Sequence, residues 1–201
     1  MKFTSKIHKA INIASWLHGG TSRKTDNDIP YIVHPFSVAF ILSEYTDDED
    51  VIAAGLLHDV LEDVEGYSAR KMEEDFGQRV LKLVQEVSED KKPGDKNERE
   101  TWDYRKNKYL KDIEKASKEA LLIACADKIH NLSSTVDAYQ RKGKVIFEKF
   151  NAPMEKRMRY YEKILKIFKK HLDCPIVREF EDVYEEAVRV IGDKYLRSSK
   201  S

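Results

Sequence analysis

The chain has 201 residues, of which 41% are hydrophobic and 36% charged, so it can bury a core and is too apolar for a disordered chain. Lysine and arginine together number 36, as do aspartate and glutamate, so overall charge gives no support to binding of nucleic acid or of an anionic membrane. The N-terminus lacks the apolar segment of a signal peptide, and no stretch approaches the roughly 20 apolar residues of a transmembrane helix. The two cysteines, Cys125 and Cys174, show no metal-binding or redox spacing. We therefore expect a cytoplasmic protein with free thiols.

The first half of the chain has the apolar periodicity of helices, with residues recurring at three- and four-residue intervals. Gly19 and Gly20 are expected to end the first helix, and Gly77 to separate two later ones. Asp48 and Ser68 are suitable N-caps for helices that start after them. The predicted helices of this half cover about residues 7–17, 34–45, 48–64, 68–76 and 80–87.

The second half begins with a basic segment, residues 91–96, that contains a Pro-Gly pair and is the clearest loop of the chain. Ser117 is a plausible helix start, and Pro153 and Pro175 lie near the entrances of the last two helices. The predicted helices of this half cover about residues 98–115, 117–139, 145–171 and 177–190. Alternating β-type runs and internal repeats are absent from the sequence, so we predict an all-α fold with one domain over residues 1–195 and a disordered tail, 196–201.

Ionisable side chains concentrate in residues 56–63, where His58, Asp59, Glu62 and Asp63 follow an apolar stretch. If this segment is one continuous helix, the four side chains lie within a sector of about 140°. Three crowded carboxylates repel one another unless solvent or a cation intervenes, and an imidazole beside a carboxylate offers two ligands to a divalent metal. The alternative is an amphipathic helix with a solvated acidic edge.

Two further residues are suited to the same metal. His34 precedes a proline, a position where histidine is more often a cap or a core residue, and Asp127 follows the apolar segment 120–126. A carboxylate at the edge of a buried helix is costly unless it is paired or metal-bound. Together with His58 and Asp59 they provide two imidazoles and two carboxylates, a set that suits manganese, iron or zinc better than calcium.

The order of these residues, a histidine, a His-Asp pair and a distant aspartate, resembles the HD phosphohydrolase superfamily. More narrowly, the chain is similar to the (p)ppGpp hydrolases, which comprise the hydrolase domain of RelA/SpoT enzymes and the small alarmone hydrolases. The likeness covers about residues 5–165 and rests on four motifs in order: RK at 23–24, PYIVHP at 30–35, LLHDVLED at 56–63 and ADKIHN at 126–131. It implies a helical bundle of the HD type and release of pyrophosphate from the 3′ position of guanosine-3′,5′-bis(diphosphate), ppGpp.

The resemblance also implies a role for individual residues. A mononuclear Mn²⁺ site, or one for another divalent transition metal, is implied for His34, His58, Asp59 and Asp127. Glu62 and Asp63 would orient or deprotonate the attacking water. Contacts with the nucleotide substrate are implied for Arg23, Lys24, Tyr31, Asn131, Arg157 and Tyr161, and a further phosphate contact for Lys106 or Lys108. Taken alone, residues 23–24 read as a solvated loop and residues 155–161 as an exposed basic helix.

Some positions depart from the family pattern. Ala124 stands where the alarmone hydrolases commonly carry lysine, and Cys125 follows it. Residues 91–97 and 101–106 also differ from the common pattern, although Trp102 or Tyr104 could stack on a base. These differences leave the identity of the substrate open, and a nucleoside monophosphate or NADPH is an alternative to ppGpp. A non-catalytic nucleotide-binding module is a third possibility, against which the intact Glu62-Asp63 pair argues. We expect no nucleic-acid or membrane partner. We expect the segment after residue 165 to be too short for a synthetase domain. The sequence does not indicate the oligomeric state.

Overall fold

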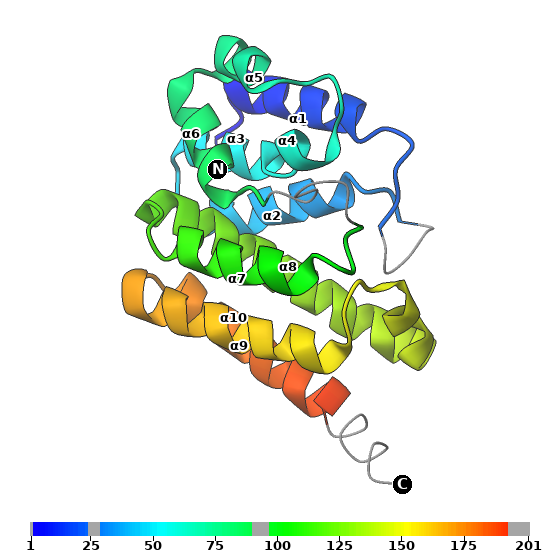
Figure 1. The fold of residues 1–201 in the computed structure, drawn as a ribbon. Coiled ribbons are helices and arrows are strands. Elements are labelled where there is room, and N and C mark those ends of the chain that lie inside the picture. Colours follow the sequence, from blue (N-terminus) through cyan, green and yellow to red (C-terminus); the bar gives the residue numbers. More distant parts are fainter. Residues whose placement is uncertain (1, 24–28, 90–96, 193–201) are drawn as a thin grey trace, which may run out of the picture.

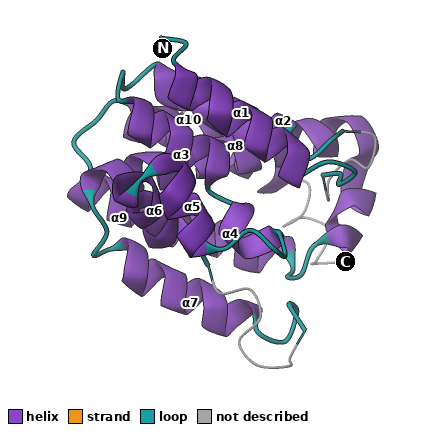
Figure 2. Cartoon of the chain, turned by 90° about the horizontal axis from the view of Figure 1, so that it is seen from above, coloured by secondary structure: helices purple, strands orange, loops and turns teal. Residues whose placement is uncertain are grey.

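The computed structural model describes residues 2–23, 29–89 and 97–192. Within these ranges every regular element is a helix, apart from an isolated bridge between Ser22 and Pro30 (Figure 2). The helices of the N-terminal half are α1 (Ser5–Leu17), α2 (Val33–Ser43), α3 (Glu49–Leu57), α4 (Val60–Asp63), α5 (Ala69–Phe76) and α6 (Gln78–Val87). Those of the C-terminal half are α7 (Trp102–Ile113), α8 (Lys118–Lys142), the 3-10 helix η1 (Gly143–Lys149), α9 (Met154–His171), α10 (Ile176–Ala187) and the π-helical turn η2 (Val188–Gly192). The predicted all-α fold is confirmed, and the predicted tail, 196–201, lies outside the described residues.

Helix α8, with 25 residues, runs through the middle of the bundle. The hydroxyl of Ser117 accepts from the main-chain N–H of Ala120 and caps its start, as predicted, and Gly143 follows its last residue with a φ of 72°. Helices α2, α3 and α6 pack on α8 from one side, and α9 and α10 pack on it from the other (Figure 1). Every side chain from Ala120 to Asp127 is buried. Asp127 is therefore carried into the interior by the same apolar segment that anchors α8.

Helices α2 and α3 approach each other closely at Gly55. A Cβ atom at this position would lie 2.4 Å from Cδ1 of Leu42, which is itself fully buried. A methyl group here would force the buried end of the Leu42 side chain to move, so glycine suits this approach. The close packing brings the C-terminal end of α3 against the start of α2, where His58 and His34 lie.

The single helix predicted over residues 48–64 is interrupted, so this prediction is wrong. Helix α3 ends at Leu57, and α4 begins only at Val60, after His58 and Asp59. The Nδ1 atom of His58 lies 2.7 Å from the carbonyl oxygen of Gly55. In a continuous helix that oxygen would accept from the main-chain N–H of Asp59, so the imidazole competes for it. The four ionisable side chains of this segment are consequently not spread over one helix face.

The helix predicted over residues 145–171 is also divided. The first part is the 3-10 helix η1, and α9 starts at Met154, directly after Pro153. Proline disfavours helical backbone at the residue before it, which accounts for the break. Cys125 and Cys174 are free thiols, as predicted. In the described part of the chain, the longer helices are too polar to cross a lipid bilayer.

Candidate metal centre and pocket

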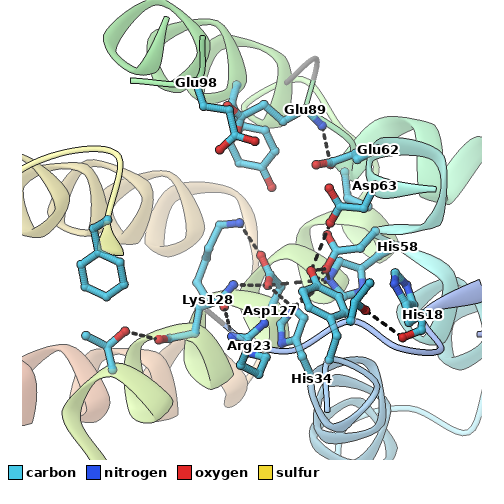
Figure 3. A pocket seen from close by; sticks show the side chains of 18 of the residues that line it. His18, Arg23, His34, His58, Glu62, Asp63, Glu89, Glu98, Asp127 and Lys128 are labelled. Carbon is cyan, nitrogen blue, oxygen red and sulfur yellow. Dashed lines mark hydrogen bonds and ion pairs between the residues drawn. The ribbon is translucent and has the colours of Figure 1, made fainter. Parts of the chain in front are cut away.

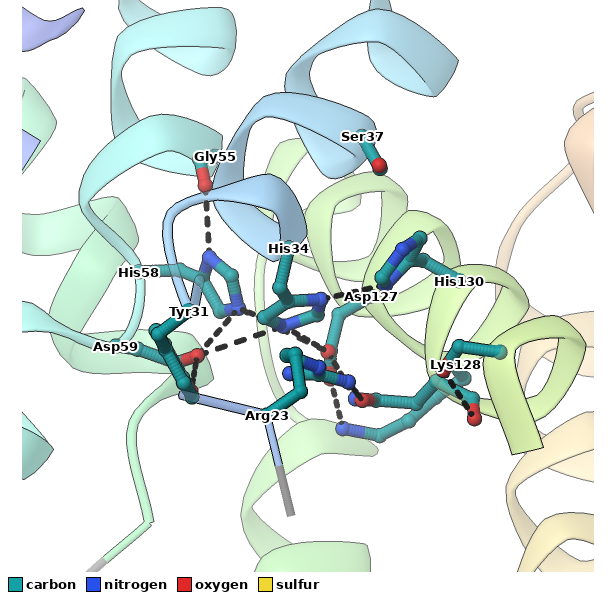
Figure 4. Close-up of polar contacts among 12 residues, drawn as sticks. Arg23, Tyr31, His34, Ser37, Gly55, His58, Asp59, Asp127, Lys128 and His130 are labelled. Atoms are coloured by element: carbon teal, nitrogen blue, oxygen red, sulfur yellow. Dashed lines mark hydrogen bonds and ion pairs between the residues drawn. The ribbon is translucent and has the colours of Figure 1, made fainter. Parts of the chain in front are cut away.

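Four side chains from separate parts of the sequence meet at one point. His34 comes from α2, His58 and Asp59 from the α3–α4 junction, and Asp127 from α8 (Figure 4). The Nε2 atom of His34 lies 3.2 Å from Nε2 of His58, 3.4 Å from Oδ2 of Asp59 and 3.1 Å from Oδ1 of Asp127. The Nε2 atom of His58 lies 3.3 Å from Asp59 Oδ2 and 3.7 Å from Asp127 Oδ1. Each imidazole thus lies within 3.7 Å of an oxygen of both carboxylates, and His34, His58 and Asp59 form a group that could hold a metal ion.

Each imidazole of this group is held in its orientation by a contact of its Nδ1 atom. Nδ1 of His58 donates to the carbonyl oxygen of Gly55, and Nδ1 of His34 lies 2.7 Å from Nδ1 of His130. Burial, together with the neighbouring His34, lowers the pKa of His130 to about 3, so its ring is neutral and can accept that hydrogen bond. In this arrangement both Nε2 atoms point toward each other and toward the two carboxylates, where a metal ion would take the place of a proton. Such a donor set fits a divalent cation, and the outer hydrogen bonds are those that metal-bound histidines usually make.

The electrostatics also favour positive charge at this point. Burial lowers the pKa of His58, but Asp59 and Asp127 outweigh it and raise the value to about 9. Burial likewise raises the pKa of Asp127, yet the neighbouring Lys128 and the two imidazoles hold it well below the usual range. Both shifts show that a cation between these groups is strongly stabilised. A divalent ion would supply that charge without protonating a ligand.

Glu62 and Asp63, the predicted catalytic pair, lie beside this group on α4. An Oε1 atom of Glu62 accepts from the main-chain N–H of Glu89 at 2.6 Å. The hydroxyl of Tyr31 bonds to Oδ2 of Asp59 and also lies 3.2 Å from Oδ2 of Asp63. Burial and the Asp59 carboxylate raise the pKa of Tyr31, so the hydroxyl remains protonated and can donate. Asp63 is therefore tied to the ligand group through Tyr31, and Glu62 to Glu89.

A pocket of about 560 Å³ opens over the metal-type group and the Glu62-Asp63 pair (Figure 3). Arg23 reaches Oδ1 of Asn131 at 2.8 Å, and its guanidinium lies 5.4 Å from the centre of the Tyr31 ring. The predicted substrate-contact residues that line the pocket are Arg23, Tyr31, Asn131, Arg157, Tyr161 and Lys106. Lys24 lies outside the described residues, and Lys108 is exposed and does not line the pocket.

Of the residues that depart from the family pattern, some line the pocket and others do not. Trp102 lines the pocket and is buried, whereas Tyr104 is exposed and lies outside it. Ala124 and Cys125 are buried in the core, and the thiol of Cys125 donates to the carbonyl oxygen of Ile176. Cys125 therefore contacts α10, and neither member of the pair lines the pocket.

A model of the HD domain family matches residues 10–169. This chain belongs to the HD domain family. The guanosine-3′,5′-bis(diphosphate) 3′-pyrophosphohydrolase MESH1 of Drosophila melanogaster is 37% identical over 131 residues, which are 64% of this HD-domain chain and 69% of that protein. The putative GTP diphosphokinase RSH1, chloroplastic, of Oryza sativa subsp. japonica is 29% identical over 214 residues, 94% of this chain and 23% of the relative.

A solved structure described as a metazoan ortholog of SpoT that hydrolyzes ppGpp superposes on this chain with a TM-score of 0.73 and 27% identity, covering 92% of this chain and 97% of the other. Several curated relatives are much longer, and the chain spans only 12% to 23% of their length. The predicted likeness to the (p)ppGpp hydrolases is confirmed by these matches. Dependence on a divalent metal is typical of HD hydrolases, and the His34-His58-Asp59 group agrees with it.

Several residues of this HD-domain site were not predicted. His130 lies three residues after Asp127, hence on the same face of α8, and that spacing was a usable signal; Asn131, four residues after Asp127, was predicted as a substrate contact. Lys128 donates to Oδ2 of Asp127, and Asn131 donates to Oδ1. Glu89 has no comparable signal in the sequence, because its partners come from α4 and α7. Further unpredicted residues that line the pocket are His18, Glu98, Tyr109, Phe150 and Tyr160.

Proposed function

We propose that this chain is a metal-dependent phosphohydrolase that releases pyrophosphate from the 3′ position of ppGpp. The observation that carries the proposal is the meeting of two imidazoles and two carboxylates next to Glu62 and Asp63 in a pocket with basic side chains. Support for the substrate comes from the names of the relatives, a 3′-pyrophosphohydrolase of ppGpp among them, and from the structural likeness to a ppGpp-hydrolysing protein. The proposed location remains the cytoplasm.

The proposed metal ligands are His34, His58, Asp59 and Asp127, and Mn²⁺ is the proposed ion. Bound there, Mn²⁺ would lower the pKa of a coordinated water and neutralise charge on the phosphate oxygens. The Gly55 carbonyl and His130 hold the two imidazoles with their Nε2 lone pairs directed at the ion position. Lys128 and Asn131 hold the Asp127 carboxylate in the same way.

The remaining chemistry is assigned to the neighbouring side chains. Glu62 and Asp63 are the acceptors for the proton of the attacking water, and the Glu89 N–H fixes one Glu62 oxygen so that the other can face the pocket. Arg23, placed between Tyr31 and Asn131, is the proposed contact for the nucleotide. Lys106, Arg157 and Tyr161 are the proposed contacts on the side of the pocket formed by α7 and α9. These side chains thus bind the substrate, orient it or accept a proton.

The test is manganese-dependent release of free pyrophosphate from ppGpp by the purified chain, with GDP as the second product. Nucleoside monophosphates and NADPH are assayed in parallel, so that another substrate of the same metal site would be recognised. The proposal is overturned if the manganese-loaded protein leaves ppGpp intact while hydrolysing one of these. Metal analysis of the freshly purified protein completes the test, because tight nucleotide binding without metal and without turnover indicates a binding module.

A further inference from the structure

Glu89 sits between two groups of the pocket that have different proposed roles. Its main-chain N–H donates to Glu62, one of the proposed proton acceptors. Its carboxylate accepts from two residues of α7, with Arg105 on Oε1 and Lys106 on Oε2 at 2.5 Å. Glu89 and Lys106 both line the pocket, and Figure 3 places Glu89 and Glu98 on the opposite side of it from His34 and Arg23.

We propose that Glu89 is a positioning residue that keeps the Lys106 side chain charged and aimed at the pocket, so that Lys106 can bind a phosphate of the substrate. This inference rests on the proposed function for the identity of the ligand as a phosphorylated nucleotide. It goes beyond that function by assigning to Glu89 a role that is exerted through Lys106.

The surroundings of Lys106 explain why such a residue is needed. Burial, with the nearby Lys128 and Arg105 guanidinium, lowers the pKa of the Lys106 ammonium, and the Glu89 carboxylate opposes this by raising it. Tyr160 of α9 offers its ring face at 5.2 Å from the Lys106 nitrogen. An anion beside an ammonium that has other cations nearby favours its protonated form. Among the groups that shift the Lys106 pKa most, the cations come from α7 and α8 and the anion is Glu89; Glu98 and Tyr109 also line this pocket.

The contacts of Arg105 indicate that the Glu89 carboxylate, and with it the Glu89–Lys106 ion pair, is held in one orientation. Arg105 is buried, and it donates to the Thr101 hydroxyl and the Glu98 carbonyl oxygen as well as to Glu89. The Glu89 carboxylate is therefore anchored through Oε1, and its Oε2 is left to hold the more exposed Lys106. An anchored acceptor fixes the donor at lower entropic cost than a freely rotating one.

Glu89 holds Glu62 through its main chain and Lys106 through its side chain, so one substitution can remove the second contact and keep the first. Glu89→Gln keeps the N–H that holds Glu62 and removes the charge that holds Lys106. We expect KM for ppGpp to rise about tenfold, the value of one charge-assisted hydrogen bond, while kcat stays nearly unchanged. The increase in KM should become larger as pH rises, because a Lys106 without its anion loses its proton at lower pH.

A double-mutant cycle separates this role from a purely structural one. Arg105 loses a partner in Glu89→Gln, so the melting temperature is expected to fall whether or not Lys106 is present. In a Lys106→Met background, however, Glu89→Gln should cause no further increase in KM. Glu162→Gln, on the exposed face of α9, is the matched control and should leave both quantities unchanged. An equal increase in KM with and without Lys106 would overturn the proposal.

A second measurement does not depend on turnover. The Lys106 side chain is followed by NMR of ¹³C-labelled lysine, with Lys106→Met supplying the assignment. The pKa of Lys106 should fall in Glu89→Gln relative to the parent protein, and an unchanged titration would overturn the proposal. If the parent protein does not hydrolyse ppGpp, the proposed function fails, and the NMR comparison still decides the role of Glu89.

Discussion

The two sides of the pocket differ in how their polar groups are satisfied. On the side of the metal-type group, His34, His58 and Asp127 each have a second partner that fixes the side chain. On the side formed by α7 and α9, the buried Nε of Arg157 and hydroxyl of Tyr160 have no hydrogen-bond partner among the described residues. Buried polar groups are normally paired. The comparison indicates that His34, His58 and Asp127 are organised before the substrate arrives, while Arg157 and Tyr160, and on the other side Nε2 of His18 beside Tyr31, have polar atoms left for it.

The largest expected effect comes from removing a group on the organised side. Asp59→Ala should abolish metal binding and hydrolysis together, because one of four proposed ligands is lost. A metal supplies several kcal/mol of transition-state stabilisation, so the loss of activity should be roughly thousandfold or more. Metal content is measured on the purified protein, and pyrophosphate release is measured with manganese added. Asp182→Ala, at an exposed ion pair of α10, is the control. Hydrolysis at the parent rate by Asp59→Ala would contradict the assignment.

Glu62→Gln should separate metal binding from catalysis. The variant keeps the size of the side chain and the hydrogen bond from Glu89, but it cannot accept a proton. We expect full metal content and a reduction of kcat by roughly 10² to 10⁴, the usual contribution of a general base. Both quantities are measured in the same preparation. A normal kcat would mean that Asp63 or another group accepts the proton.

His130→Ala tests whether the outer hydrogen bonds matter on the organised side. Without His130, the Nδ1 atom of His34 loses its partner, and the ring is free to change orientation or tautomer. Metal affinity should fall by about 10- to 100-fold, as for other outer partners of metal-bound histidines. Manganese titration followed calorimetrically gives this value, with the exposed His8→Ala as a control. Parent-like affinity would show that the orientation of His34 is held by packing.

Tyr160→Phe should have the smallest effect, and it addresses the other side of the pocket. Its hydroxyl has no partner among the described residues, so its removal should leave the melting temperature unchanged or slightly higher. If the hydroxyl bonds to substrate, KM should rise by up to about tenfold, the value of one hydrogen bond. Tyr184→Phe on α10 serves as the comparison. A clear loss of stability would mean that the hydroxyl has a partner within the folded protein.

The same difference between the two sides explains how much could be predicted from the sequence. The helices and the all-α fold follow from apolar periodicity, and the four proposed ligands stand in short motifs where their residue types are distinctive. The break between α3 and α4 could not be predicted, because it depends on the His58 ring taking the Gly55 carbonyl. Glu89 was missed for a similar reason, since its importance comes from α4 and α7 and not from its neighbours in sequence.

The interruption after Leu57 has a consequence for how the site can change. Because His58 and Asp59 form the junction between two helices, Glu62 and Asp63 stand on the separate short helix α4, while α3 packs against α2. Substitutions that disturb only the short α4 should therefore leave metal binding intact and abolish hydrolysis. An unbroken helix would not allow metal binding and catalysis to be separated in this way.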